Sequence, residues 1–332
     1  MSSKGESQFA LDQIVASADL TESPWVNGRF KPDLDLAGQL FSVPVESGEI
    51  DNQQTGAAAR SLDVWIAHEL RRAGFAPGSV WPRATPPRVL PAEFDPVGGA
   101  LEEAREALRR LAHRLAGYEG AAERMGLKKR APSLKGMDAA LNKIERAFPG
   151  KADARILGSF YVKQVDVAVS TWQRGPDILV SGKTQLSSYG KNTNNRYEEA
   201  VGDGKNLRDR YPLAAMGFAH VVRSTILDEE DAFTLLRDRL IKLRQPHGFF
   251  DATMLLVLEW DDETRKLSPI QDATEKLTAS RFFKDLVDAL LDRTPVGVHQ
   301  AVRELRFGEL MGVLPKEFED VSPDEAAAHD AD

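Results

Sequence analysis

The chain has 332 residues, of which 42% are apolar and 28% are charged, and it contains no cysteine. That length is ample for one elaborate domain or two smaller ones with a buried core. The lack of cysteine excludes disulfide scaffolds, thiolate zinc sites and cysteine nucleophiles, and it suits a cytoplasmic protein. No apolar run approaches the roughly 18 residues that a membrane span needs, so we expect no membrane partner.

The charge is unevenly distributed along the chain. The formal net charge is −8, but residues 124–210 hold 17 basic and 9 acidic residues, a net of +8. A basic segment within an acidic chain is either a surface for an anionic partner or a chance excess on an ordinary solvated surface, and the charge alone favours neither.

The first part of the chain is predicted to be an extension of a core that lies further on. Residues 1–54 are polar without a sustained period, which predicts an irregular or partly disordered segment. Apolar residues then recur at threes and fours from Thr55 until Gly74, and a second helical pattern covers 99–116. We therefore expect residues 55–130 to form a helical region that serves recognition or dimerisation.

Helices and strands alternate after a proline and glycine break at 131–136. The expected helices are 138–148, 194–210, 229–243 and 280–292, and the expected strands are 155–170, 177–186, 214–223 and 252–260. This order predicts an α/β fold, with a mixed central sheet flanked by helices over 131–315. The acidic, alanine-rich tail 316–332 is expected to be disordered.

The stretch Val165–Gln185 reads as a β-hairpin that gathers polar residues. In the expected register Asp166 lies opposite Ser181, and Lys183 lies one pair further along. Alternation places Ser181, Lys183 and Gln185 on one face of their strand. Asp166 and Lys183 are therefore expected to converge on one spot.

Two choices of acidic residue stay open. Asp177 shares a face with Lys183 but lies about 20 Å away along the strand, although a one-residue shift in register would turn Asp166 to the wrong face. Glu198 and Glu199 follow in the next helix, and because adjacent helical residues point about 100° apart, only one of them is expected to face the sheet.

These residues resemble the PD-(D/E)XK nuclease superfamily, which includes most type II restriction endonucleases. The resemblance covers roughly 138–260 and rests on the element order and on Asp166, Lys183 and the two glutamates. The family's usual acid two residues before the lysine is Ser181 here. One restriction-enzyme subgroup has a Ser-x-Lys strand and carries the missing acid on the following helix, where Glu198 lies.

The resemblance implies a Mg²⁺ site, with Mn²⁺ as a substitute. The implied metal ligands are Asp166, Glu198, Glu199 and the backbone carbonyl of Gly182. Lys183 would orient the attacking water and contact the phosphate, and Gln185 would position substrate or water. Glu145, on the helix before the hairpin, would be a further acid near the metal.

The function implied is that of a Mg²⁺-dependent type II restriction endonuclease with this restriction-endonuclease-like core. Its partner would be double-stranded DNA, bound by a homodimer, with a cognate methyltransferase acting separately. The alternative is a catalytically inactive DNA-binding or defence-complex protein that keeps the nuclease fold, because Ser181 replaces the usual acid. Nothing in the sequence separates a DNA enzyme from an RNA enzyme.

Overall fold

The computed structural model describes residues 3–20, 22–50, 56–83, 95–125, 137, 139, 154–244, 246 and 248–308. The α-helices are α1 (Ser3–Ser17), α2 (Leu34–Glu46), α3 (Gly56–Arg72), α4 (Asp95–Arg124), α6 (Tyr189–Arg208), α7 (Glu230–Lys242), α8 (Ala279–Arg293) and α9 (Gln300–Phe307). The strands are β1 (Trp25–Val26), β2 (Arg29–Phe30), β3 (Val80–Trp81), β4 (Ala154–Leu157), β5 (Val162–Val165), β6 (Val167–Thr171), β7 (Gly175–Gln185), β8 (Ala215–Arg223), β9 (Ala252–Leu258) and β10 (Gln271–Asp272). Short 3-10 helices cover Pro77–Ser79, Ser224–Asp228 and Glu275–Leu277.

A six-stranded mixed sheet in the order β10-β9-β8-β7-β6-β3 forms the centre of the protein. Strands β7, β8 and β9 are parallel, whereas β6 is antiparallel to both β7 and β3. All but the last residue of β8 are buried, as is typical of a central parallel strand that is covered on both faces. The prediction of an α/β fold with a mixed sheet flanked by helices is confirmed.

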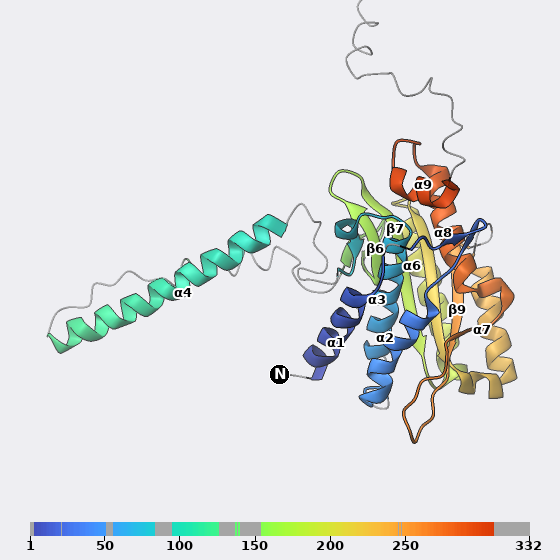
Figure 1. Cartoon of the computed structure of the whole chain (residues 1–332), viewed down its shortest axis with the longest axis horizontal. Coiled ribbons are helices and arrows are strands. Elements are labelled where there is room, and N and C mark those ends of the chain that lie inside the picture. Colours follow the sequence, from blue (N-terminus) through green and yellow to red (C-terminus); the bar gives the residue numbers. More distant parts are fainter. Residues whose placement is uncertain are drawn as a thin grey trace, which may run out of the picture.

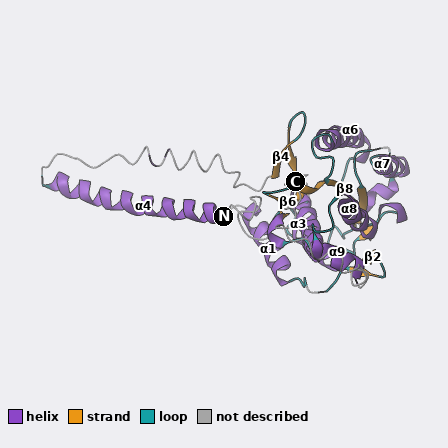
Figure 2. Ribbon diagram, turned by 90° about the horizontal axis from the view of Figure 1, so that it is seen from above, coloured by secondary structure: helices purple, strands orange, loops and turns teal. Residues whose placement is uncertain are grey.

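Helices cover both faces of this sheet (Figures 1 and 2). Helices α1, α2, α3 and α8 lie on one face, and α6 and α7 lie on the other. On the first face Trp65 of α3 and Phe282 of α8 share a core with Val180 of β7. On the second, Leu240 of α7 packs in a core with Phe218 of β8.

The N-terminal segment is folded, and the prediction of an irregular segment over residues 1–54 is wrong. Leu11 of α1 and Phe41 of α2 are fully buried in the core of the first sheet face. Helix α2 begins where the Asp33 side chain accepts a hydrogen bond from the Leu36 N–H at 2.8 Å. Its apolar face is short and lies between polar stretches, so the sequence shows no long period.

The boundary predicted near residue 131 is also wrong for the part before it. Helix α3, expected in a separate recognition region, packs against the central sheet, and Leu62 shares a core with Val167 and Val180. Strand β3 extends the same sheet beside β6. Helix α4 extends away from this body in both views (Figures 1 and 2). The expected helix 138–148 and tail 316–332 lie outside the described residues.

The strand predicted over 155–170 is divided into three pieces. Strands β4 and β5 form a hairpin of their own, and the chain joins the central sheet only as β6. The side chain of Asn206 on α6 holds the tip of the hairpin, since its Oδ1 accepts from the N–H groups of Phe160 and Tyr161 at 2.7 and 3.1 Å. The turn therefore depends on a side chain that is distant in the sequence.

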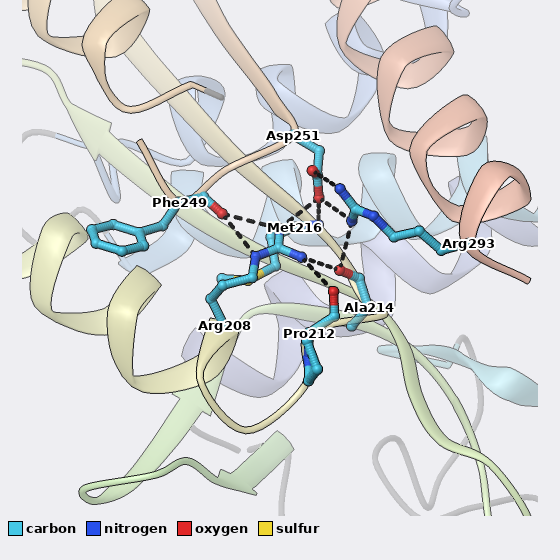
Figure 3. Close-up of polar contacts among 7 residues, drawn as sticks. All are labelled: Arg208, Pro212, Ala214, Met216, Phe249, Asp251 and Arg293. Atoms are coloured by element: carbon cyan, nitrogen blue, oxygen red, sulfur yellow. Dashed lines mark hydrogen bonds and ion pairs between the residues drawn. The ribbon is translucent and has the colours of Figure 1, made fainter. Parts of the chain in front are cut away.

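A buried ion cluster joins the amino ends of β8 and β9 to the carboxyl ends of α6 and α8 (Figure 3). The Asp251 carboxylate pairs with Arg208 at 2.7 Å and with Arg293, and it accepts from the Met216 N–H at 2.8 Å. Arg208 also donates to the carbonyl of Ala214 at 2.7 Å. These contacts outweigh the burial of Asp251, which alone would raise its pKa, and hold that pKa below its usual value.

In the described part of the chain, no helix combines the length and apolar character required to cross a bilayer.

Candidate functional site

Asp166 lies where the chain leaves the central sheet, between the end of β5 and the start of β6. The predicted hairpin register is confirmed on its sheet side, because Val167 pairs with Val180 and Val169 pairs with Ile178. Beyond Val167 the two strands separate, and the Asp166 side chain takes the place of a backbone partner. Its Oδ2 accepts the Gly182 N–H at 2.8 Å.

A second carboxylate, that of Asp63, approaches Gly182 from the sheet face that α3 covers. Gly182 permits this approach, because a Cβ at that position would lie 3.3 Å from the Asp63 Oδ1 and 3.1 Å from the Leu62 Cδ2. Burial and then the charge of Asp166 raise the pKa of Asp63 well above its usual value, with Arg60 opposing. The pair therefore holds more negative charge than its protein surroundings neutralise.

The pKa of Asp166 is also raised above its usual value. Burial raises its pKa, although the Gly182 N–H and the charges of Lys183 and Lys163 act in the opposite direction. Two neighbouring carboxylates with raised pKa values tend to share a proton or to bind a cation. This is the property expected of an acidic site that is ready to accept a ligand.

Lys183 reaches a carboxylate of the following helix. Its Nζ lies 3.1 Å from Oε1 of Glu199, and Arg196 bonds the other carboxylate oxygen at 3.2 Å. Partial burial alone would raise the pKa of Glu199, but the charge of Lys183 and these hydrogen bonds lower it. Glu198 is exposed and makes no contact of this kind, so the structure brings Glu199, rather than Glu198, to the lysine.

A second lysine borders the cluster. Lys163 of β5 forms an ion pair with Asp203 of α6, and the Tyr161 hydroxyl donates to Asp203 at 2.9 Å. Burial and this hydrogen bond raise the pKa of Tyr161 to about 12, so its hydroxyl stays protonated. These contacts fix the β4–β5 hairpin on α6 and so help to position Asp166, which directly follows β5.

Of the other sequence candidates, Gln185 and Asp177 make their contacts outside this cluster. Gln185 donates to the carbonyls of Ser188 and Tyr189, at 3.1 and 3.3 Å, and so ties β7 to the start of α6. Asp177, at the far end of β7, pairs with Arg174 at 3.0 Å. Ser181 is buried within the strand. Glu145 lies outside the described residues.

The residues fit a divalent cation only if backbone and water oxygens complete its coordination. Among the described residues, no three His, Cys, Asp or Glu side chains gather closely enough to hold a metal ion by themselves. Mg²⁺ seldom needs such a group, since it keeps several waters and is commonly bound through one or two carboxylates and a substrate phosphate. The pair Asp63 and Asp166 meets that requirement, and its excess negative charge favours a cation.

Asp63 was missed by the sequence reasoning, which proposed Glu145 as the acid on the preceding helix. The only signal was an acidic residue beside Leu62 in a helix that is otherwise apolar on that side. Its partner Asp166 lies about a hundred residues further on, so only the fold reveals the pair.

The region around Gly182 thus has two acids with raised pKa values and, on the sheet face that α6 covers, a lysine that pairs with a third acid. Such a set can bind a cation, hold a water or phosphate at the ammonium, and move protons. No family model, no curated protein and no solved structure matches this chain.

Proposed function

We propose that this protein is a Mg²⁺-dependent endonuclease that hydrolyses phosphodiester bonds in DNA. One observation carries the proposal: the Asp166 carboxylate accepts the Gly182 N–H, the Asp63 carboxylate approaches Gly182 from the α3 face, and Lys183 follows Gly182 in the strand. A cation site beside a positioned ammonium is what metal-assisted hydrolysis of a phosphodiester requires.

The order of elements supports a restriction-endonuclease-like fold of the PD-(D/E)XK type. Helix α3 precedes the antiparallel strands β3, β6 and β7, and helix α6 then leads to β8, which is parallel to β7. Asp166 and Lys183 lie on β6's edge and on β7, as the resemblance implies. The Ser-x-Lys variant, with its acid on the following helix, has a counterpart in the contact between Lys183 and Glu199.

A bound Mg²⁺ would lower the pKa of a coordinated water and neutralise charge on the phosphate. Asp63 and Asp166 would hold it, with the Gly182 carbonyl as a further oxygen donor and water completing the coordination. Lys183 binds a phosphate oxygen or the attacking water as a point charge. Glu199 accepts a hydrogen bond from the Lys183 ammonium, and Arg196 bonds the same carboxylate, so the ammonium is held on the sheet face that α6 covers.

The proposed substrate is double-stranded DNA, bound by a two-fold dimer so that each protomer cuts one strand. The chemistry of the site serves a phosphodiester of either nucleic acid, so an RNA duplex is the comparison substrate. A second candidate, a DNA-binding protein without catalysis, is favoured by Ser181, which is buried where the usual acid would stand.

The test is cleavage of plasmid and genomic DNA with Mg²⁺ and with EDTA. Wild type should produce fragments only with metal, and Lys183→Ala should reduce the rate by a factor of about 10²–10⁴. Glu199→Gln should also reduce the rate, whereas Glu198→Gln is the matched control, because the neighbouring side chain is exposed and makes no contact with Lys183. Equal cleavage by Lys183→Ala and wild type would exclude the proposed site, and loss of cleavage in Glu198→Gln alone would exclude the assignment of Glu199.

A further inference from the structure

The β4–β5 hairpin presents one face to solvent. Cross-strand pairing places Arg155 opposite Gln164 and Leu157 opposite Val162. Opposed and alternate residues of a β-ribbon share a face, so these four side chains form one surface, which we call the outer face. All four are exposed, Leu157 by 50% and Val162 by 55%. At the tip of the hairpin Phe160 is 69% exposed.

The backbone of the hairpin tip is firmly held, although its side chains are exposed. The Asn206 amide donates to the Tyr161 carbonyl at 3.0 Å, and Gly158 lies so close that a Cβ there would be 2.2 Å from that amide nitrogen. The Tyr211 hydroxyl donates to the Leu157 carbonyl at 2.9 Å. A surface that is ordered before it binds loses little conformational entropy on binding, so the tip is suited to recognition.

The charge and the shape of the hairpin both fit duplex DNA. Residues 154–165 contain two basic residues, Arg155 and Lys163, and no acidic residue. Arg210 is exposed next to the hairpin, because its neighbour Tyr211 bonds to it. The major groove of B-DNA is about 12 Å wide and admits a two-stranded β-ribbon. A basic ribbon of this kind therefore complements both the phosphates and the groove between them.

The outer face carries the types of side chain that read bases in the major groove. Arginine forms paired hydrogen bonds with guanine, and glutamine forms them with adenine. Arg155 and Gln164 supply these two groups side by side. Apolar side chains contact the methyl group of thymine, and Leu157 and Val162 supply that contact further along the same face.

The hairpin leads directly into the candidate site. Gln164 precedes Asp166 by two residues, which is about 7 Å along a strand, and Phe160 precedes it by six, which is at most about 20 Å. Successive nucleotides of a strand are about 3.4 Å apart along the duplex axis. Bases that contact the outer face would therefore lie about two to six base pairs from a phosphate held at Asp166.

We propose that the outer face of the β4–β5 hairpin enters the major groove of duplex DNA and reads its base sequence. Arg155 and Gln164 each select one base, and the apolar side chains contact thymine methyl groups. This inference deepens the proposed nuclease function and rests on it for the identity of the partner. It also favours DNA over RNA, because side chains cannot read the deep, narrow major groove of an RNA duplex.

The first test is the selection of duplexes from a randomised DNA pool by the full chain, in Ca²⁺ and again in EDTA. Wild type should enrich one sequence. Arg155→Ala and Gln164→Ala should each lose the preference at one base pair, by about fivefold to a hundredfold, the value of one bidentate base contact. Both should still bind unselected DNA, because phosphate contacts supply that affinity.

Gln173→Ala is the matched control, because it removes an exposed glutamine from the turn between β6 and β7. It should enrich the same sequence as wild type. If Arg155→Ala and Gln164→Ala also enrich that sequence unchanged, or if wild type enriches no sequence under either condition, the proposal is overturned.

A second measurement probes the groove with the wild-type protein. In the enriched duplex, 7-deazaguanine or 7-deazaadenine in place of the natural base removes only the N7 acceptor, which faces the major groove. One such replacement should weaken binding by wild type, and it should weaken binding by Arg155→Ala or Gln164→Ala no further. Unchanged binding of every replaced duplex by wild type would overturn the proposal.

A second copy of the chain is the other occupant that an exposed apolar surface suits. Leu157→Asp should leave the molar mass in solution unchanged, as measured by light scattering, and should weaken binding to the enriched duplex. A change from dimer to monomer, with the sequence preference of wild type retained, would assign the outer face to a protein interface and overturn the proposal.

The failure of this inference is distinguishable from the failure of the proposed function, because duplex selection without Mg²⁺ does not depend on cleavage. A sequence preference that Arg155→Ala and Gln164→Ala lose, in a protein that does not cut DNA with Mg²⁺, would reject the nuclease function alone. Cleavage by wild type at a sequence that both variants still prefer would reject the role of the hairpin alone.

Discussion

The two clusters of buried charge in this protein are built on opposite principles. At the amino ends of β8 and β9, Asp251 lies between two guanidinium groups, and its pKa is lowered. Near the carboxyl half of β7, Asp63 and Asp166 lie together, and the pKa of each is raised. In the first cluster the positive partners outweigh the effect of burial on the acid, whereas in the second the charges of Lys183, Lys163 and Arg60 do not.

This difference separates a structural role from a functional one. Burying a charge is tolerable when partners and hydrogen bonds compensate for lost hydration, as Arg208, Arg293 and the Met216 N–H do for Asp251. Acids that are held together without such compensation destabilise the native state unless a proton or cation joins them. The second arrangement is therefore the one that the proposed function assigns to a bound cation.

The largest expected effect is the loss of the complete cluster. Asp251→Asn should lower the free energy of unfolding by up to about 3–5 kcal/mol, because two partly buried guanidinium groups lose the buried anion between them. Asp166→Asn, measured by urea unfolding under the same metal-free conditions, should raise that free energy or leave it within about 1 kcal/mol. If the two substitutions lower the free energy of unfolding equally, Asp166 stabilises the fold as Asp251 does, and the contrast between the two clusters is wrong.

Added metal should sharpen the comparison. At a Mg²⁺ concentration a hundredfold above Kd, the wild-type free energy of unfolding should rise by about 2.7 kcal/mol through binding to the native state. Asp166→Asn should lose this gain in a thermal or urea unfolding series, while Glu198→Gln should keep it. A gain that survives in Asp166→Asn would place the cation elsewhere.

The smallest effect is a difference in pH dependence. Because the native-state pKa of Asp63 is raised, its stabilising contribution is present below the ordinary carboxyl value of about 3.9 and is lost as pH rises through the raised pKa. Asp63→Asn should therefore gain stability over wild type as pH rises above about 4, by about 1.4 kcal/mol for each unit of the shift.

Asp251 should show the reverse, because its lowered pKa gives a contribution that is present above about 3.9 and lost as pH falls. The deficit of Asp251→Asn should therefore shrink in acid. Urea unfolding at several pH values, without divalent metal, measures both trends. Parallel curves for Asp63→Asn and wild type would show that Asp63 is not strained.

The sequence predicted those helices and strands whose apolar pattern depends only on neighbouring residues. The apolar runs of β8 and β9 and the helical period of α8 are each fixed by neighbouring residues, and all three were predicted to within a few positions. The division of 155–170 was not predictable, because Asn206 on a later helix holds the hairpin tip. The fold of residues 1–54 was missed because the buried residues of α1 and α2 find partners only in the assembled core.

The candidate site shows the same limit. The resemblance suggested an acid of the following helix near Lys183. Because adjacent helical residues point about 100° apart, only the orientation of the helix decides between Glu198 and Glu199. Asp166 was favoured over Asp177 from the register, and the structure places it beside Gly182. Asp63 required the packing of α3 on the sheet, which no local pattern encodes.

Gly182 determines how closely Asp63 and Asp166 can approach each other. Its N–H binds Asp166, and the hydrogen in place of a side chain lets Leu62 and Asp63 approach the strand. The separation of the two acids is thus set by how closely a helix rests on a sheet, and not by the acids themselves. Backbone spacing is therefore the variable through which selection or design can adjust the affinity of the pair for a proton or a cation, with both carboxylates left in place.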